Sequence, residues 1–206
     1  KLSIPFDTRA PKEVLKDLNS LGIEASYFNP SMLIKSNGLQ SSNGRIYPLG
    51  GISNFTTILS NESGYYPIIE TDEHGFNNPK GFYEKNKVDI MLTGDSFTEG
   101  KSVHSNETIG AVLRQWDFNA ISVGKAGNGS LLELAALKEY AEPLQPKIVL
   151  WLYYRGDIVS DLRSEFGSTI LRNYLTDFDF TQNLISRQAE IDKVLKNNWI
   201  KEKFQN

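Results

Sequence analysis

The chain has 206 residues, no cysteine, and 22 basic against 25 acidic side chains, which gives a formal net charge of -3. This length suffices for one α/β domain with a sizeable core and an attached segment, but not for two independent enzymes. The charges are spread along the sequence, which argues against nucleic acid or an anionic membrane surface as a partner. Disulfides and thiolate metal sites are excluded, whereas the redox compartment stays open.

No part of the sequence approaches the roughly 20 consecutive apolar residues that span a bilayer, and the first ten residues lack the pattern of a signal peptide. We therefore expect no membrane span. The first residue is Lys1 rather than methionine, so the sequence does not choose between the cell envelope, the periplasm and the cytoplasm.

Residues 1–86 predict one helix followed by short strands and loops. The helix is expected in PFDTRAPKEVLKDLNSLG, capped by Asp7 or Thr8 and ended by Gly22. Three apolar side chains share its inner face: Val14, Leu15 and Leu18. From residue 23 onward, β-prone runs such as TTIL and YYPIIE alternate with turn residues, which predicts hairpins and loops.

Residues 87–206 predict an α/β domain, because strands there alternate with helical patterns around a parallel sheet. The predicted strands are VDIMLT, NAISVG and KIVLWLYY. The third is apolar along nearly its whole length, as a strand covered on both faces should be.

Three helices are predicted from NETIGAVLRQW, SLLELAALKEYAEPL and FTQNLISRQAEIDKVLKNNWIKEKF. In the second helix Ser130 is the expected cap, and the helix should end near Pro143. Apolar residues at helical spacing define the inner face of the first two helices: Ile109, Val112, Leu113 and Trp116, then Leu131, Leu134, Ala135 and Leu137.

Polar loops follow the three predicted strands, and they read GDSFTEG, GKAGNGS and RGDIVSDL. Ligands of open parallel sheets bind outside the carboxyl ends of the strands, so these loops should meet at one edge. Ser96 lies just past the first strand, where its hydroxyl can face that crevice. The glycines around Gly127 lead into a helix, so their backbone N–H groups can face a developing negative charge.

The order of these loops resembles the SGNH, or GDSL-type, hydrolases over about residues 88–162. The resemblance implies a three-layer, flavodoxin-like parallel sheet with Ser96 as nucleophile and Gly127 as second oxyanion donor. It implies no metal and no organic cofactor. Together with TDEHGFNNP and PKIVLWLYY, the loops also resemble an uncharacterised bacterial SGNH-like group with an extra N-terminal segment.

Two features depart from the family's pattern. The position of the family's third-loop asparagine falls on Asp157, and an ionised carboxylate there would repel an oxyanion. The site could still work if Asp157 is protonated, if Arg155 supplies the charge, or if Asn128 donates instead. Second, a C-terminal Asp-x-x-His, which supplies the base in the family, has no match in the sequence.

The two histidines lie upstream of the position where the family carries its base. His104 follows Ser96 by eight positions and is a candidate substitute base, and His74 is a weaker one. Three strands are fewer than the about five of such folds, so we expect an incomplete domain that stops before its final strands. The third strand would then expose its edge, which favours a homodimer or a cover by the last helix.

Each polar residue also has a purely structural interpretation. Ser96 can cap the segment after it, Gly127 and Asn128 can form a plain turn, and Asp95 is expected to bond loop backbone. Asp157 and Asp161 are read as solvated loop carboxylates rather than metal ligands. The Gly-x-Ser-x-Gly elbow of α/β-hydrolases is excluded, because a threonine occupies its second glycine position.

The sequence therefore predicts an ester hydrolase or O-acyl (acetyl) transferase domain that acts on small-molecule or carbohydrate O-acyl esters. As this chain it is expected to be inactive, because the base is missing. The alternative is a non-catalytic binding or assembly module with the same framework. A third interpretation is a flavodoxin-like binder of phosphate or flavin, with GDSFTEG around the phosphate.

Overall fold

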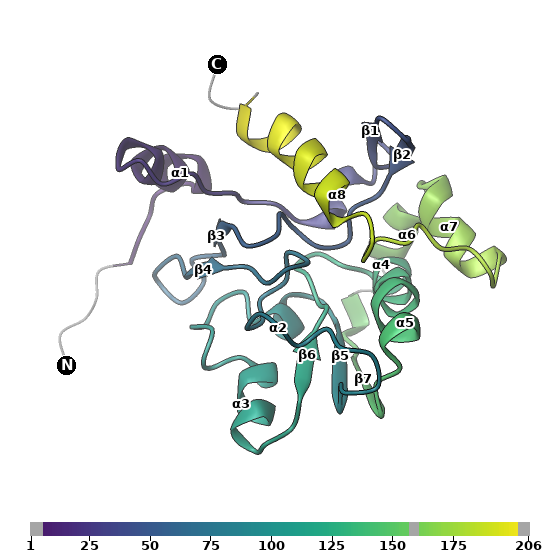
Figure 1. The fold of residues 1–206 in the computed structure, drawn as a ribbon. Helices are drawn as coiled ribbons and strands as arrows, with labels where there is room; N and C mark the ends of the chain where they lie inside the picture. The colour runs from purple at the N-terminus through teal and green to yellow at the C-terminus, as the bar shows by residue number, and fades with distance from the viewer. Residues whose placement is uncertain (1–5, 157–160, 202–206) are drawn as a thin grey trace.

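The computed structural model describes residues 6–156 and 161–201 (Figure 1). Its first half holds one α-helix, one 3-10 turn and two antiparallel hairpins. These elements are α1 (Pro11–Ser20), η1 (Pro30–Leu33), β1 (Leu39–Ser41) paired with β2 (Gly44–Ile46), and β3 (Thr56–Ile58) paired with β4 (Ile68–Glu70). The hairpins and loops expected from the sequence are confirmed in this region.

The second half is a three-stranded parallel sheet flanked by helices. Its elements are β5 (Ile90–Gly94), α2 (Ser96–Glu99), α3 (Ile109–Gln115), β6 (Ala120–Ser122), α4 (Ser130–Ala136), η2 (Leu137–Ala141), α5 (Glu142–Leu144), β7 (Ile148–Leu152), α6 (Leu162–Glu165), α7 (Thr169–Thr176), α8 (Gln188–Leu195) and η4 (Lys196–Lys201). All three predicted strands are confirmed. Within the described ranges no helix is both long and apolar enough to cross a membrane.

Helix α1 begins later than the sequence suggested. Its cap is Ala10, because Pro11 at the first helical position fixes the backbone angle with which the helix starts. The Ala10 N–H donates to the Glu13 carboxylate at 2.7 Å. The predicted cap at Asp7 or Thr8 is wrong, and Asp7 instead pairs with Arg9 at 2.6 Å.

The strands of the sheet lie in the order β6-β5-β7, and all pairs are parallel. Alternate residues of β5 therefore point to opposite faces. On one face Thr93 donates from its hydroxyl to the backbone carbonyl of Glu133 in α4, at 3.3 Å. On the other face Leu92 packs with Leu113 of α3. The sheet is thus the middle layer of three.

Helix α3 packs through small residues rather than through most of its large apolar ones. Gly110 and Ala111 are its buried positions. Ile109, Val112 and Trp116 are exposed, so the predicted inner face of this helix is wrong except at the half-buried Leu113. Helix α3 contacts strand β6 of the sheet.

Strand β7 is an exposed edge, contrary to the prediction that both its faces are covered. Its first four side chains are 38–50 % exposed, and within the described chain β7 pairs only with β5. Helices α3 and α4 pack on β6 and β5, and on β7 the Trp151 indole N–H donates to the Glu133 carboxylate of α4 at 2.7 Å, so this strand is only partly covered. The expected exposure of this edge is therefore confirmed.

The last helix does not cover that edge. Helix α8 lies against the N-terminal segment, on the far side from β7 (Figure 1). Asp192 of α8 accepts a hydrogen bond from the Ser53 N–H at 2.8 Å, and Gln188 donates to the Gly51 carbonyl at 3.2 Å. The alternative that the last helix covers the exposed edge of the sheet is therefore wrong.

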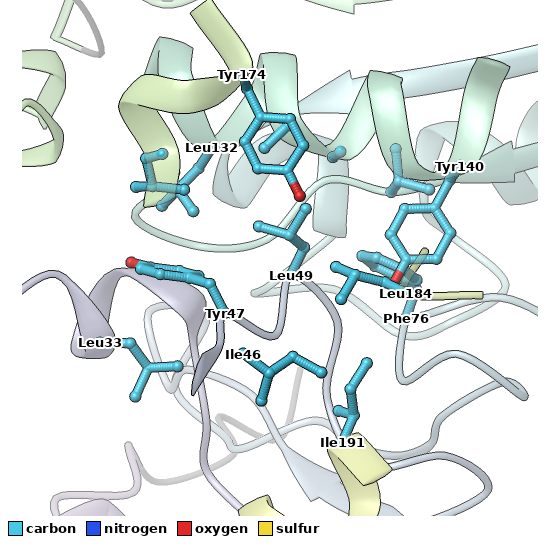
Figure 2. Packing of buried hydrophobic residues seen from close by; sticks show 14 of the residues in the cluster. Leu33, Ile46, Tyr47, Leu49, Phe76, Leu132, Tyr140, Tyr174, Leu184 and Ile191 are labelled. Atoms are coloured by element: carbon cyan, nitrogen blue, oxygen red, sulfur yellow. The ribbon is translucent and has the colours of Figure 1, made fainter. Parts of the chain in front are cut away.

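One hydrophobic core joins the N-terminal segment to the sheet (Figure 2). Tyr47 and Phe76 come from the first half of the chain, Leu132 and Tyr140 from the α4–η2 helix, and Ile191 from α8. The predicted inner face of the α4 helix lacked Leu132, which is fully buried. The N-terminal segment is therefore packed into the structure rather than appended to it.

Asn78 fastens the N-terminal segment to the sheet. Its side-chain amide bonds both backbone groups of Ser122, donating at 2.9 Å and accepting at 2.8 Å. It also donates to the buried carboxylate of Asp72. Burial raises the pKa of Asp72 to about 6. The amide thus imitates one residue of a neighbouring strand beside β6.

Besides the single turn α2, two helices, α6 and α7, were not predicted from the sequence. Helix α7 begins at a serine cap, where the Ser168 hydroxyl accepts from the Leu171 N–H at 3.2 Å. Leu171 and Tyr174 are its buried side chains. Both helices are short, so their apolar periods are too brief to stand out.

Candidate functional site

Ser96 is the first residue of the one-turn helix α2, directly beyond the carboxyl end of β5. Asp95 accepts from the Phe97 N–H at 3.0 Å, which confirms the expected bond of this aspartate to loop backbone. Asp95 is thereby the cap of α2, so the structural interpretation in which Ser96 is the cap is wrong. The Ser96 hydroxyl lies 3.4 Å from the other Asp95 oxygen, a long contact for two oxygen atoms. Ser96 is half-buried, and it lines a hollow of about 270 Å³.

The walls of this hollow come from two distant parts of the chain. Most of them belong to the loop after α2 and to the start of α3, and Glu62 comes from the loop between β3 and β4. The other lining residues are Phe97, Gly100, Lys101, Ser102, Val103, Glu107, Thr108 and Ile109. The Ser102 hydroxyl lies 2.8 Å from the Ser60 hydroxyl and 3.1 Å from the Glu62 carboxylate, which holds the two loops together.

Sequence reasoning missed the charged residues of the hollow. Lys101 and Glu107 follow the serine loop closely, so proximity alone could have suggested them. Glu62 lies in a hairpin loop 34 positions before Ser96, and no pattern pointed to it. The carboxylates of Glu62 and Glu107 line the same hollow as Ser96, and their negative charge would repel the phosphate of the third interpretation, a phosphate or flavin binder.

The second loop is fixed beside α2 by a buried ion pair. Glu99, at the end of α2, accepts from the Lys125 ammonium group, and both side chains are 1 % exposed. The other Glu99 oxygen accepts from the Ala126 N–H at 2.9 Å. Two of the three predicted loops are therefore joined directly, by residues that the sequence analysis had not singled out.

Close packing around Thr98 explains two glycines of these loops. A side chain at Gly124 would bring its Cβ within 2.6 Å of the Thr98 Cβ, and one at Gly94 would lie 2.2 Å from the Thr98 hydroxyl. Both distances are far below van der Waals contact. The glycines thus let the first two loops touch.

Gly127 adopts a left-handed backbone conformation, with φ at +75°. A Cβ at this position would also lie 2.7 Å from the Ser31 hydroxyl, so glycine is required for two reasons. Within the described chain the N–H groups of Gly127 and Ser96 have no hydrogen-bond partner. The next residue, Asn128, is 1 % exposed, and its side-chain amide oxygen has no hydrogen-bond partner among the described residues.

The N–H groups at the start of α4 are already occupied. Glu165 accepts from the N–H groups of Gly129 at 2.6 Å and Leu131 at 2.8 Å. The predicted cap at Ser130 is therefore wrong, since Gly129 is the cap residue and the carboxylate comes from α6. Burial raises the pKa of Glu165 to about 7, although these N–H groups oppose the shift.

The third loop is only partly placed. Asp157, which the resemblance aligns with the asparagine of SGNH hydrolases, lies outside the described residues. Arg155 is exposed beyond the end of β7, and no ion pair of its own is found in the described part of the chain. Asp161 is half-buried at the start of α6 and packs against Gly129. A Cβ added at Gly129 would lie 2.8 Å from the Cβ of Asp161.

Neither histidine hydrogen-bonds Ser96. His104 is exposed and stacks on Tyr65, with 4.8 Å between the ring centroids, and its ring does not line the hollow. His74 lies in the core against Tyr83, where burial lowers its pKa. Residues 6–156 and 161–201 also contain no cluster of three side chains suited to a metal ion.

Comparison of the chain with protein-family models, with curated proteins and with solved structures gives no match. Function is therefore inferred from the geometry of the two joined loops and from the motifs that they carry.

The raised pKa of Glu165 predicts a specific pH dependence of stability. The folded protein binds this proton more tightly than the unfolded chain, whose carboxyl group titrates near 4.5. The protonated Glu165 should therefore contribute up to about 3 kcal/mol to the free energy of unfolding. This contribution should be complete below about pH 4.5 and lost as the pH rises to about 7. Urea unfolding at several pH values, for the wild type and Glu165→Gln, measures it as the pH-dependent part of their difference.

The exposed Glu142→Gln serves as the matched control, and its curve should run parallel to that of the wild type. An unchanged difference between wild type and Glu165→Gln across this pH range would contradict the assignment.

Proposed function

We propose that this chain is an SGNH-type acyl-transfer domain with a flavodoxin-like arrangement, either a serine ester hydrolase or an O-acyl transferase. One observation supports the proposal most directly. Ser96 lines a hollow, while the second loop, whose Gly127 N–H has no partner within the described chain, is held against the helix that carries this serine. A plain turn does not need a buried ion pair to hold it there.

In the proposed reaction the Ser96 oxygen attacks the carbonyl carbon of an ester and forms the new C–O bond. The bond to the leaving alcohol oxygen breaks, and that oxygen keeps the electron pair. The N–H groups of Ser96 and Gly127 stabilise the negative charge on the carbonyl oxygen. The serine proton needs a base, and the described residues bring no imidazole to it, so the proton passes to a base in solution.

Asn128 and Arg155 have supporting roles in this proposal. Asn128 follows Gly127 within the second loop, and its buried side-chain amide can orient that loop or donate toward the charge. Arg155 is the cationic residue nearest in sequence to Asp157. Its positive charge would offset the carboxylate of Asp157, which disfavours the oxyanion. Neither residue replaces the missing base.

The hollow beside Ser96 suits a small acyl group. Its volume of about 270 Å³ lies at the lower limit of small-molecule sites. Phe97, Val103 and Ile109 give it apolar walls, and Lys101 with two carboxylates gives it a polar rim. We therefore propose O-acyl esters of a small molecule or a carbohydrate as substrate, with no cofactor.

We expect Ser96 to be acetylated by p-nitrophenyl acetate when imidazole is added as an external base. Turnover without imidazole should be little better than that of Ser96→Ala, because a positioned general base contributes about a hundredfold or more. With imidazole, peptide mapping by mass spectrometry should find the acetyl group on the peptide that contains Ser96.

The Ser96→Ala protein is the control, since it retains every other nucleophile and the background reaction of imidazole. Equal labelling of this peptide region in both proteins would contradict the proposed nucleophile. Turnover well above the control without imidazole would show instead that a base exists within the chain.

The exposed edge of β7 favours a second candidate function, that of a non-catalytic assembly module. An unpaired strand with apolar side chains on both faces is a ready template for another strand. A second copy of the chain could pair antiparallel through β7 about a twofold axis, so that both edges are satisfied at once. This arrangement is the homodimer expected from the sequence.

If β7 joins two copies, Leu150→Lys should convert the protein to a monomer, because the change places a charge at the centre of the paired edge. Sedimentation velocity over a range of concentrations measures this. Ile68→Lys, on the exposed side of β4, is the matched control and should leave the dimer intact. A wild-type protein that stays monomeric at every concentration would remove the assembly role.

A further inference from the structure

The Glu99–Lys125 pair is the most completely buried charge pair of the described chain, and it joins the serine helix α2 to the second loop. Both side chains are 1 % exposed. Removing two charges from water is costly, and apolar residues of similar volume often stabilise a core as well or better. Stability of the core alone therefore does not account for this pair.

The contacts of Glu99 show what an apolar pair could not provide. Glu99 is three residues after Ser96 and closes the same helical turn. One of its oxygens accepts from Lys125, and the other accepts from the Ala126 N–H at 2.9 Å. These two residues directly precede Gly127, so a single carboxylate fixes the position of the Gly127 N–H relative to the serine helix.

Neighbouring contacts hold both ends of this connection. The backbone carbonyl of Glu99 accepts from the Asn77 side-chain amide at 2.9 Å, which ties the end of α2 to the N-terminal segment. The Lys125 N–H donates to the carbonyl of Gly94 at 3.3 Å, which ties the second loop to the end of β5. The carboxylate therefore acts between two anchored segments.

We propose that Glu99 and Lys125 are positioning residues that set the distance between the Ser96 hydroxyl and the Gly127 N–H. The inference rests on the proposed acyl-transfer function. Neither residue touches the ester. Their effect is on the maximal rate of acylation, because a displaced donor stabilises the transition-state oxyanion less while ester binding in the hollow is unchanged.

The test is the rate of Ser96 acetylation by p-nitrophenyl acetate with imidazole present, followed by mass spectrometry as the ester concentration is raised. The variant Glu99→Leu/Lys125→Met fills the same space without charge, so it should fold. We expect its maximal acetylation rate to fall about tenfold or more, with the half-saturating ester concentration unchanged. Glu99→Gln/Lys125→Gln keeps an acceptor for the Ala126 N–H and should recover part of that rate.

The exposed pair of Glu70 and Lys80 gives the control, as Glu70→Leu/Lys80→Met, whose rate should equal that of the wild type. Circular dichroism confirms folding of each variant. A folded Glu99→Leu/Lys125→Met protein with the wild-type maximal rate would overturn the positioning role while leaving the function intact. A wild type without Ser96-specific acetylation would remove both the function and this role.

Discussion

The buried contact of Glu99 with Lys125 and with the Ala126 N–H is the interaction on which the site depends. Parallel strands bring their carboxyl ends to one edge, but the sheet does not by itself fix the loops beyond them. The carboxylate of Glu99 does so, because it ends the serine helix and holds the residues before Gly127. This contact adds to the close packing of Thr98 against Gly124 and to the hydrogen bond of the Lys125 N–H with Gly94, and of these contacts it alone bonds the residue directly before Gly127.

The N-terminal segment completes this arrangement rather than standing beside it. Asn77 bonds the end of the serine helix, Asn78 pairs with the backbone of Ser122, and Glu62 forms part of the wall of the hollow. A division of the chain near residue 86 follows the change of sequence pattern, yet the hydrophobic core crosses it. The site is therefore built from both halves.

Local patterns in the sequence predicted the local structure well. They failed where the burial or the hydrogen bonds of a residue depend on residues distant in the sequence. The three strands and the bond of Asp95 to loop backbone follow from short-range periodicity and turn chemistry, and the structure has them. The exposure of Trp151 on β7 depends on which helices cover which strand, and the carboxylate at the start of α4 comes from Glu165, 36 residues beyond Gly129. Glu99 and Lys125 gave no signal because their burial depends on each other.

Amide hydrogen exchange measured residue by residue tests the central contact most directly. The Ala126 N–H donates to a buried carboxylate, whereas the N–H of the adjacent Gly127 is free within the described chain. The account predicts slow exchange at Ala126, comparable to that of the core strand residue Leu92, and fast exchange at Gly127. Equally fast exchange at both amides would contradict it, because the second loop would then not be held against the serine helix.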